Sequence, residues 1–386
     1  MNGRFDIGII GGGIIGMTLA RSLVMRGASV AVIDAGATVP AATNAAAGML
    51  APSFECGGAV TKSLQEFSMS SLAAWPSFAA SLEEETGLDI DYQSKGILGV
   101  FYDEIAWAKA REDCDNLRRR GSDVDILTGD EARRIEPALS GDVIGALHAR
   151  QDGQVDPRKA LTALRTVVVK NQGHILNGRV IRVARDDGGY LLETDNGERV
   201  AATKIVLASG AAAKAALIPD LETPPIFAVK GDAVALRFPE NILRKVVRAP
   251  GAYLCPKAGG RLVIGASEAP YCEDLSVDQA AIDGLIRNGA RALPALDNVE
   301  VAERWAGLRP ATPDAAPLLG RDPEGPEGVF LALGHYRNGV LLAPESADIL
   351  ADELTDIRAD RSNSAVLDAF SPDRFRQSHV AQQRTV

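Results

Sequence analysis

Three observations predict an α/β fold for this chain. An apolar run at residues 7–10 is broken by three glycines and followed by apolar residues at helical spacing. A second apolar run, SVAVID, closes this unit at residue 34, so strand, helix and strand fit within about thirty residues. Strand-like segments then dominate residues 89–103 and 226–268. The first two observations predict a parallel sheet, and the third predicts a second, β-rich part.

The order of these patterns predicts a discontinuous domain organisation. We expect residues 1–88, 146–222 and 306–386 to form the nucleotide-binding domain, and residues 89–145 and 223–305 to form the β-rich domain.

Three local signals define further elements. Residues 173–210 have the pattern of an antiparallel meander, with a turn at Asn196-Gly197 between two apolar runs. Thr128 and Glu131 form a capping box that predicts a short helix. The apolar residues after Gly339 predict the final helix of the chain.

Composition narrows the classes of function. The chain has 386 residues, 46% of them hydrophobic, and its net charge of −10 argues against a nucleic-acid partner. The most apolar run, residues 7–20, is too short and too rich in glycine for a membrane span. Cys56, Cys114, Cys255 and Cys272 form no metal-binding spacing, and scattered thiols without a secretion signal favour a cytoplasmic location.

A glycine motif follows the first strand. In Gly11-x-Gly13-x-x-Gly16, the first glycine permits a tight turn, the second lets a pyrophosphate approach the backbone, and the third lets helix and strand pack closely. Asp34 ends the second strand, where a carboxylate accepts hydrogen bonds from ribose hydroxyls. This context predicts a Rossmann-like dinucleotide site, the alternative being a glycine-rich turn in an unrelated α/β protein.

The remaining segments favour FAD over NAD as the dinucleotide. TNAAAGMLAP at 43–52 is a small-residue loop that leaves room for a ring system, and the segments 178–183 and 205–211 offer backbone contacts for the adenine end. An enzyme that binds both FAD and a nicotinamide cofactor usually carries two glycine motifs, and this chain has one. Its electrons are therefore expected to come directly from a substrate.

Arg337 stands in GHYRNGVLLAPE, just before the final predicted helix. A helix N-terminus already carries partial positive charge and unpaired N–H groups. An arginine added there indicates that an anionic group lies in front of it.

Nine stretches carry a resemblance to a known family: IIGGGIIGMTLA, AAAGMLAP, DGQVDPRKALTAL, IVLASGA, VKGD, YLCPKAGGRLVIGAS, RWAGLRPATPDAAPLLGR, GHYRNGVLLAP and FSPDRF. In this order, over nearly the whole chain, they resemble the D-amino acid oxidase superfamily of flavoproteins. AAAGML, WAGLRP and GHYRNG are most similar to the glycine oxidases of the thiamine-thiazole pathway. The resemblance implies noncovalent FAD in a Rossmann-like FAD-binding domain, a β-rich substrate-binding domain, and oxidation of a small amino acid to an imine.

The resemblance also assigns residues to roles. Arg309 matches the residue that pairs with the substrate carboxylate, Tyr253 matches a hydroxyl donor to that group, and Arg337 would project toward the substrate. The alternatives are an interface salt bridge for either arginine, a core role for Tyr253 and a structural role for His335. Residues expected to contact the cofactor are Gly11, Gly13, Ile14, Ile15, Gly16, Asp34, Ala35, Thr43, Ala46, Ala47, Gly48, Met49, Val180, Ala208, Ser209, Gly210, His335, Arg337, Asn338, Gly339, Val340 and Leu341.

Three positions depart from the patterns of related enzymes. Sarcosine oxidases attach FAD through a cysteine near the position of Leu308 and use a lysine where this chain has Val263. Glu268 stands where a glycine oxidase pocket is expected to be apolar. It is either a surface residue or a cavity residue that pairs with a substrate ammonium.

The resemblance predicts that glycine, oxygen and water give glyoxylate, ammonia and hydrogen peroxide, by hydride transfer to flavin N5 from a neutral amine and without a protein base. Sarcosine and D-alanine remain alternative substrates. A D-amino acid or N-methyl amino acid dehydrogenase with a quinone or protein acceptor is one rival, and a noncatalytic electron-relay FAD subunit is another. A homo-oligomer is expected by analogy with related flavoproteins.

Overall fold

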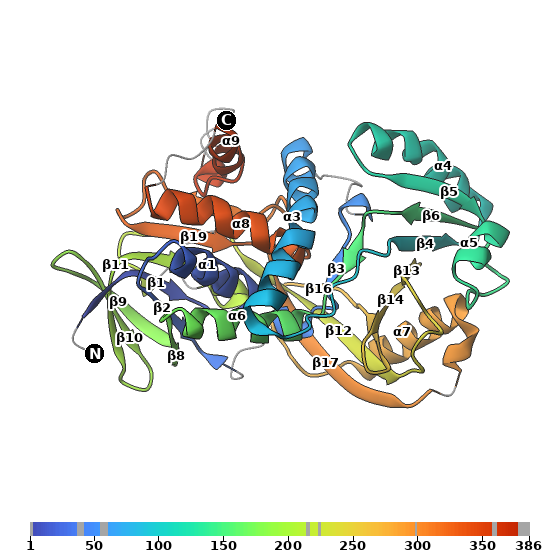
Figure 1. Ribbon diagram of the computed structural model, residues 1–386, viewed down its shortest axis with the longest axis horizontal. Helices are drawn as coiled ribbons and strands as arrows, with labels where there is room; N and C mark the ends of the chain where they lie inside the picture. The colour runs from blue at the N-terminus through green and yellow to red at the C-terminus, as the bar shows by residue number, and fades with distance from the viewer. Residues whose placement is uncertain are drawn as a thin grey trace, which may run out of the picture.

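Two large sheets organise the molecule and lie toward opposite ends of its long axis (Figure 1). The computed structural model describes residues 3–36, 42–54, 61–213, 217–222, 225–297, 299–356 and 361–376.

The first sheet has eight strands and a parallel centre. Its strands are β1 (Arg4–Ile10), β2 (Val30–Asp34), β8 (His174–Asn177), β9 (Val180–Asp186), β10 (Gly189–Thr194), β11 (Arg199–Leu207), β18 (Leu318–Arg321) and β19 (Val329–Leu333). The order β19-β11-β1-β2-β8 is parallel throughout, and β18 pairs antiparallel with β19 at the edge. Helix α1 (Ile14–Met25) connects β1 to β2, which confirms the predicted β-α-β unit.

The predicted meander is confirmed in part. Strands β9, β10 and β11 pair antiparallel in sequence, and their second turn falls at Asn196-Gly197, where Gly197 has a φ of 86°. The prediction was wrong for β8, which pairs parallel with β2 instead. The reason is that β8 follows the crossover helix α6 (Pro157–Lys170), and a strand that returns from such a helix joins its sheet in parallel.

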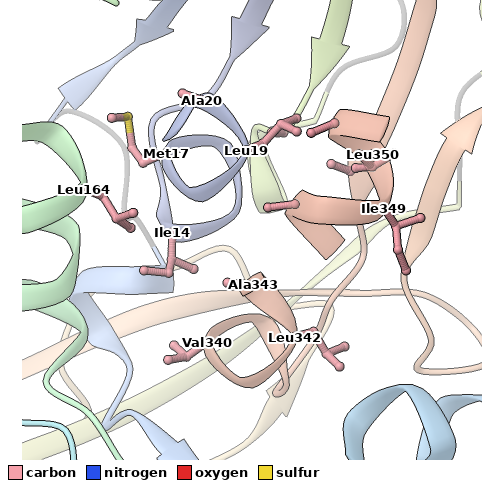
Figure 2. Close-up of a cluster of buried hydrophobic side chains, with 14 of the residues drawn as sticks. Ile14, Met17, Leu19, Ala20, Leu164, Val340, Leu342, Ala343, Ile349 and Leu350 are labelled. Carbon is pink, nitrogen blue, oxygen red and sulfur yellow. The ribbon is translucent and has the colours of Figure 1, made fainter. Parts of the chain in front are cut away.

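Helices pack against the parallel sheet and form its largest core. Figure 2 shows Ile14 of α1 near Val340 and Ala343 of α8 (Gly339–Leu354), and Met17 of α1 near Leu164 of α6. All five side chains are buried, so these helices form one apolar layer. The long helix α3 (Lys62–Thr86) packs against α8 in the same layer (Figure 1).

Helix α8 is not the final helix, which corrects the prediction. A further helix, α9 (Arg361–Ala369), follows it, and the next residue, Phe370, has a buried side chain. The Phe370 carbonyl accepts a hydrogen bond from the Leu319 N–H at 2.9 Å, which ties this segment to β18. The helix RSNSAVLDA is short and mostly polar, so its helical signal is weak.

The second sheet has nine strands and is mostly antiparallel. Its strands are β4 (Ile97–Phe101), β5 (Val124–Thr128), β6 (Gly145–Ala149), β12 (Phe227–Arg237), β13 (Val246–Ala249), β14 (Ala252–Lys257), β15 (Arg261–Gly265), β16 (Ala269–Pro270) and β17 (Val301–Ala311). Helices α4 (Glu104–Arg119), α5 (Gly129–Ile135) and α7 (Gln279–Ala292) accompany it. The capping box of Thr128 and Glu131 is confirmed at the start of α5. The domain boundaries stay a prediction, and β6 and β17 each cross one of them.

The described cysteines are all free thiols. Cys114 and Cys255 are buried free thiols, Cys272 is partly exposed and free, and Cys56 lies outside the described residues. No helix within the described ranges is long and apolar enough to cross a membrane.

Candidate active site

A cavity of about 860 Å³ runs between the two sheets. The turn after β1, the segment 42–51, strands β13 to β15, strand β17 and the turn before α8 all contribute to its lining. Two segments that are distant in sequence, the first glycine turn and the start of α8, therefore meet at one site.

The glycine turn is shaped by steric limits on its backbone. Gly11 has a φ of 115°, and a Cβ there would lie 2.5 Å from the Ala208 carbonyl oxygen. A Cβ at Gly16 would overlap the carbonyl oxygen of Gly11. At Gly13 the nearest atom to such a Cβ is the Thr43 hydroxyl at 3.2 Å, so the space in front of this glycine remains open to the cavity.

Small residues form the part of the cavity wall next to this turn. The segment expected to be a loop contains one helical turn, α2 (Ala42–Ala45), and a short strand, β3 (Met49–Leu50), which pairs with β7 (Gly153–Gln154). A Cβ at Gly307 would overlap the Ala45 side chain, and the Trp305 indole donates a hydrogen bond to the Ala45 carbonyl at 3.0 Å. The overlap at Gly307 explains why this position of β17 carries no side chain where it meets Ala45 of α2.

The N-termini of two helices face the same cavity. At α1, the Ile14 N–H donates to the Thr43 hydroxyl at 2.9 Å, and Gly13 supplies no side-chain cap. At α8, Asn338 makes no side-chain cap bond, while Ser71 and Trp75 of α3 hold the Leu341 carbonyl at 2.7 and 3.0 Å. Two positive helix ends suit a ligand with negative charge at two separated places.

The buried hydroxyl of Ser209 supports the same conclusion. Its oxygen has no hydrogen-bond partner among the described residues, and Ser209 lines the cavity beside Ala208 and Gly210. Buried polar groups usually have partners, so an unpartnered hydroxyl in a cavity wall fits a polar ligand. The glycine turn, the two helix ends and this hydroxyl fit a long dinucleotide such as FAD.

Asp34 lies at the cavity and is not isolated. Its carboxylate forms an ion pair with Arg165 of α6, a contact that spans 131 residues of sequence. One carboxylate oxygen is thus held in place while the side chain keeps some exposure to the cavity. Sequence reasoning missed Arg165, because no local pattern links it to Asp34.

Most of the residues expected at the site line this cavity. Two cofactor residues lie behind the lining: Gly16 is packed on the Gly11 backbone, and the Leu341 side chain is buried in the helical core. Those in the lining are Gly11, Gly13, Ile14, Ile15, Asp34, Ala35, Thr43, Ala46, Ala47, Gly48, Met49, Val180, Ala208, Ser209, Gly210, His335, Arg337, Asn338, Gly339 and Val340, together with Tyr253, Glu268 and Arg309. Their individual roles stay predictions.

Arg309 and Tyr253 lie together in the part of the cavity that strands β14 and β17 line. The guanidinium of Arg309 contacts the Tyr253 hydroxyl, and its own contacts to the carbonyl oxygens of Lys230 and Ser267 are long, at 3.4 and 3.3 Å. Among the residues that the structure describes, no carboxylate lies within 4 Å of Arg309, which argues against an interface salt bridge. Burial raises the pKa of Tyr253 to about 12, so its hydroxyl stays protonated as a donor.

Glu268 also lines the cavity, and it is paired. Its carboxylate accepts hydrogen bonds from the Tyr336 hydroxyl and from Arg337, with which it forms an ion pair. Burial raises the pKa of Glu268, but these two hydrogen bonds, together with the charges of Arg337 and Arg309, outweigh burial and hold the pKa below its usual range. Arg337 therefore faces the cavity as one half of an ion pair.

His335 is buried, and it lines the cavity. Its Nε2 lies 3.2 Å from the Ser346 hydroxyl, and burial lowers its pKa to about 3. The imidazole is therefore neutral at ordinary pH.

Arg248 is a cavity residue that sequence reasoning missed. It lies on β13, directly across from Tyr253 of β14, and its guanidinium stacks over the Phe54 ring at 5.1 Å. Its segment, KVVRAPG, has no motif that marks it as part of a site.

The fold, the glycine turn and the two helix ends at the cavity fit a dinucleotide-binding oxidoreductase. A family model described as FAD dependent oxidoreductase matches residues 6–353. The chain belongs to this family, and it is an FAD-dependent enzyme that oxidises amino acids.

Individual relatives agree with this assignment. A glycine oxidase from Geobacillus kaustophilus is 35% identical over 91% of this chain and 93% of its own length. The crystal structure of a glycine oxidase from the same organism superposes with a TM-score of 0.86 at 32% identity, covering 96% of this chain and 99% of that one. The bifunctional protein ThiO/ThiG of Synechocystis is 33% identical over 96% of this chain, which spans 54% of that relative's length.

Proposed function

We propose that the protein oxidises glycine, with oxygen and water, to glyoxylate, ammonia and hydrogen peroxide. The observation that carries this proposal is Arg309, a cavity arginine with no carboxylate partner among the described residues, next to the protonated hydroxyl of Tyr253. A planar guanidinium binds a carboxylate through two parallel hydrogen bonds and so fixes its orientation as well as its charge. The similarity to glycine oxidases supports the choice of substrate.

In this proposal the side chains bind and orient more than they react. Arg309 and Tyr253 hold the carboxylate, which fixes the direction of the Cα–H bond. FAD, when bound, would supply a hydride acceptor for the Cα–H bond and the redox chemistry that reduces oxygen to peroxide. The N–H groups of Gly339, Val340 and Leu341, at the start of α8, would stabilise negative charge near the cofactor.

The described lining offers little support for a histidine base. Its one histidine, His335, is neutral, buried and close to the Ser346 hydroxyl. This suits proton loss from the amine before substrate oxidation, so that the neutral amine reacts. Water would then hydrolyse the imine product to glyoxylate and ammonia.

Four further features belong to the proposal. The FAD is held noncovalently, since the segment around Leu308, where sarcosine oxidases carry their attachment cysteine, contains none, and none of the described cysteines lines the cavity. The enzyme works in the cytoplasm, and it assembles as a homo-oligomer like related flavoproteins. The imine serves thiazole synthesis, for which the family resemblance and the match to ThiO/ThiG proteins are the support.

Anaerobic mixing of the purified flavoprotein with glycine, sarcosine, D-alanine and D-proline tests the proposal. We expect glycine to bleach the visible flavin band, and air to restore it rapidly with formation of peroxide and glyoxylate. Bleaching followed by slow recovery in air would replace the oxidase with a dehydrogenase that uses another acceptor. If none of the four amino acids bleached the flavin, the glycine assignment would be wrong.

A further inference from the structure

We propose that Glu268 is a specificity-determining residue: by holding Arg337 in an ion pair, it makes the cavity select substrates with a single carboxylate and disfavour those with a second anionic group. This inference rests on the proposed function, because it concerns the amino acid bound at Arg309. Glu268 is the residue that stands where the family resemblance predicts an apolar side chain.

The ion pair joins two parts of the molecule across the cavity. Glu268 lies between β15 and β16 of the nine-stranded sheet, whereas Tyr336 and Arg337 precede α8 beside the parallel sheet. Glu268 and Arg337 are each 39% exposed. The contact spans 69 residues of sequence, so it is a product of the fold.

The backbone and ring of Tyr336 keep this arrangement in place. Its N–H donates to the Pro310 carbonyl at 2.8 Å, and its φ of 48° lies in the left-handed region that a tyrosine seldom adopts. The Arg337 guanidinium lies 5.2 Å from the centre of the Tyr336 ring. Glu268 thus accepts a hydrogen bond from the Tyr336 hydroxyl, and Arg337 stacks on the ring of the same tyrosine. Each of the three side chains contacts the other two.

The two arginines of the substrate end therefore differ in electrostatic state. Glu268 forms a direct ion pair with Arg337 and interacts with Arg309 only at longer range, and the described residues place no carboxylate within 4 Å of Arg309. An incoming carboxylate meets an attractive site at Arg309. A second carboxylate on the same substrate must either displace Glu268 from Arg337 or lie against the Glu268 carboxylate.

Repulsion of this kind is an established route to specificity. A site discriminates against the wrong ligand by placing an unfavourable charge where that ligand differs. Sarcosine and iminodiacetate form a matched pair, since the second is the first with a carboxylate added on its N-methyl carbon. A half-exposed charge is partly screened, so we expect a moderate effect of about tenfold.

Glu268→Gln tests the proposal, because it removes the charge and retains a hydrogen-bond acceptor. We expect the ratio of kcat/KM for iminodiacetate to that for sarcosine to rise about tenfold in this variant. Glu268→Asp, which keeps the charge, should stay near the wild-type ratio.

Glu273→Gln is the matched control. Glu273 also lines the cavity and loses the same charge in this variant, whereas the ion pair that the structure gives for Arg337 is with Glu268. A change in the ratio that is equally large in Glu273→Gln would show a general charge effect and overturn the proposal. An unchanged ratio in Glu268→Gln would overturn it as well.

A binding measurement separates this inference from the proposed function. Methoxyacetate and diglycolate are ether counterparts of sarcosine and iminodiacetate without the amine, and their binding can be followed by the change in the visible flavin spectrum. We expect Glu268→Gln to tighten the Kd of diglycolate about tenfold relative to that of methoxyacetate. The proposal fails if this ratio stays constant, whatever the outcome of glycine turnover.

Discussion

The two ends of the cavity are built in different ways. At the cofactor end, the β1–α1 turn is shaped by glycines, backbone N–H groups and close helix packing, within a stretch of sequence that ends at α1. At the proposed substrate end, the residues come from separate strands and turns: Tyr253, Glu268, Arg309 and Arg337.

Because of this difference, the two ends should respond differently to amino-acid substitution. A backbone site tolerates almost no added volume, because the atoms it would displace are main-chain atoms. At a site built from side chains, a substitution leaves the fold intact and weakens binding of the ligand instead. Changes at the cofactor end should therefore remove flavin and stability together, while changes at the substrate end should leave a yellow, folded protein.

Gly16→Ala should have the largest effect. Its Cβ would overlap the carbonyl oxygen of Gly11, and neither backbone can move away without separating α1 from β1. We expect a loss of about 3 kcal/mol or more in the free energy of unfolding, and purification with little flavin. The ratio of visible to ultraviolet absorbance and a urea titration measure both quantities.

Gly284→Ala in α7 is the control for that substitution, since nothing lies within 4 Å of the Cβ it would introduce. It should keep its flavin and gain up to about 1 kcal/mol from helix propensity. A Gly16→Ala protein with full flavin would contradict the backbone account of the cofactor end.

Tyr253→Phe should have an intermediate effect that is confined to the substrate end. The change removes a hydroxyl in contact with Arg309 and keeps the ring in its apolar setting. Hydrogen bonds to charged groups contribute about 1.5–3 kcal/mol, so we expect kcat/KM for glycine to fall by tenfold or more. Flavin content should stay at the wild-type level, and loss of flavin would show that the two ends are not separable in this way.

His335→Gln should have the smallest effect at neutral pH and a clear one in acid. Burial lowers the pKa of His335 to about 3, so the folded protein disfavours the protonated form that the unfolded chain adopts below about pH 6.5. The neutral histidine thus contributes stability above pH 6.5 that is lost as the pH falls toward 3. The variant should lose stability less steeply over this window, by up to about 1.4 kcal/mol per pH unit. Urea titrations of the wild type and the variant from pH 7 to 4 give the free energy of unfolding at each pH. If it fell equally steeply with pH in both proteins, this account of His335 would be wrong.

The features that could be predicted from the sequence are those with local causes. The β1–α1–β2 unit, the turn at Asn196-Gly197 and the capping box before α5 each depend on residues within one short segment. The family resemblance added the residues of the substrate end, which no periodicity distinguishes from ordinary core or surface positions.

The features that escaped prediction depend on contacts between distant segments. Strand β8 was placed in the meander because its pairing with β2 is set by the crossover through α6. The pairing of Asp34 with Arg165 and the place of Arg248 opposite Tyr253 likewise arise only in the folded chain. The sequence left open whether Glu268 was a surface or a cavity residue, and its ion pair with Arg337 across the cavity is visible only in the fold.

The most direct test of the central claim compares glycine with glycinamide in anaerobic flavin reduction, for the wild-type protein and for Arg309→Ala. Glycinamide has no carboxylate, so the wild type should prefer glycine by on the order of a hundredfold, the value of two charged hydrogen bonds. In Arg309→Ala the ratio of glycine to glycinamide reactivity should fall toward one, while the flavin content stays unchanged. A variant that kept the full preference for glycine would contradict the claim that Arg309 reads the substrate carboxylate.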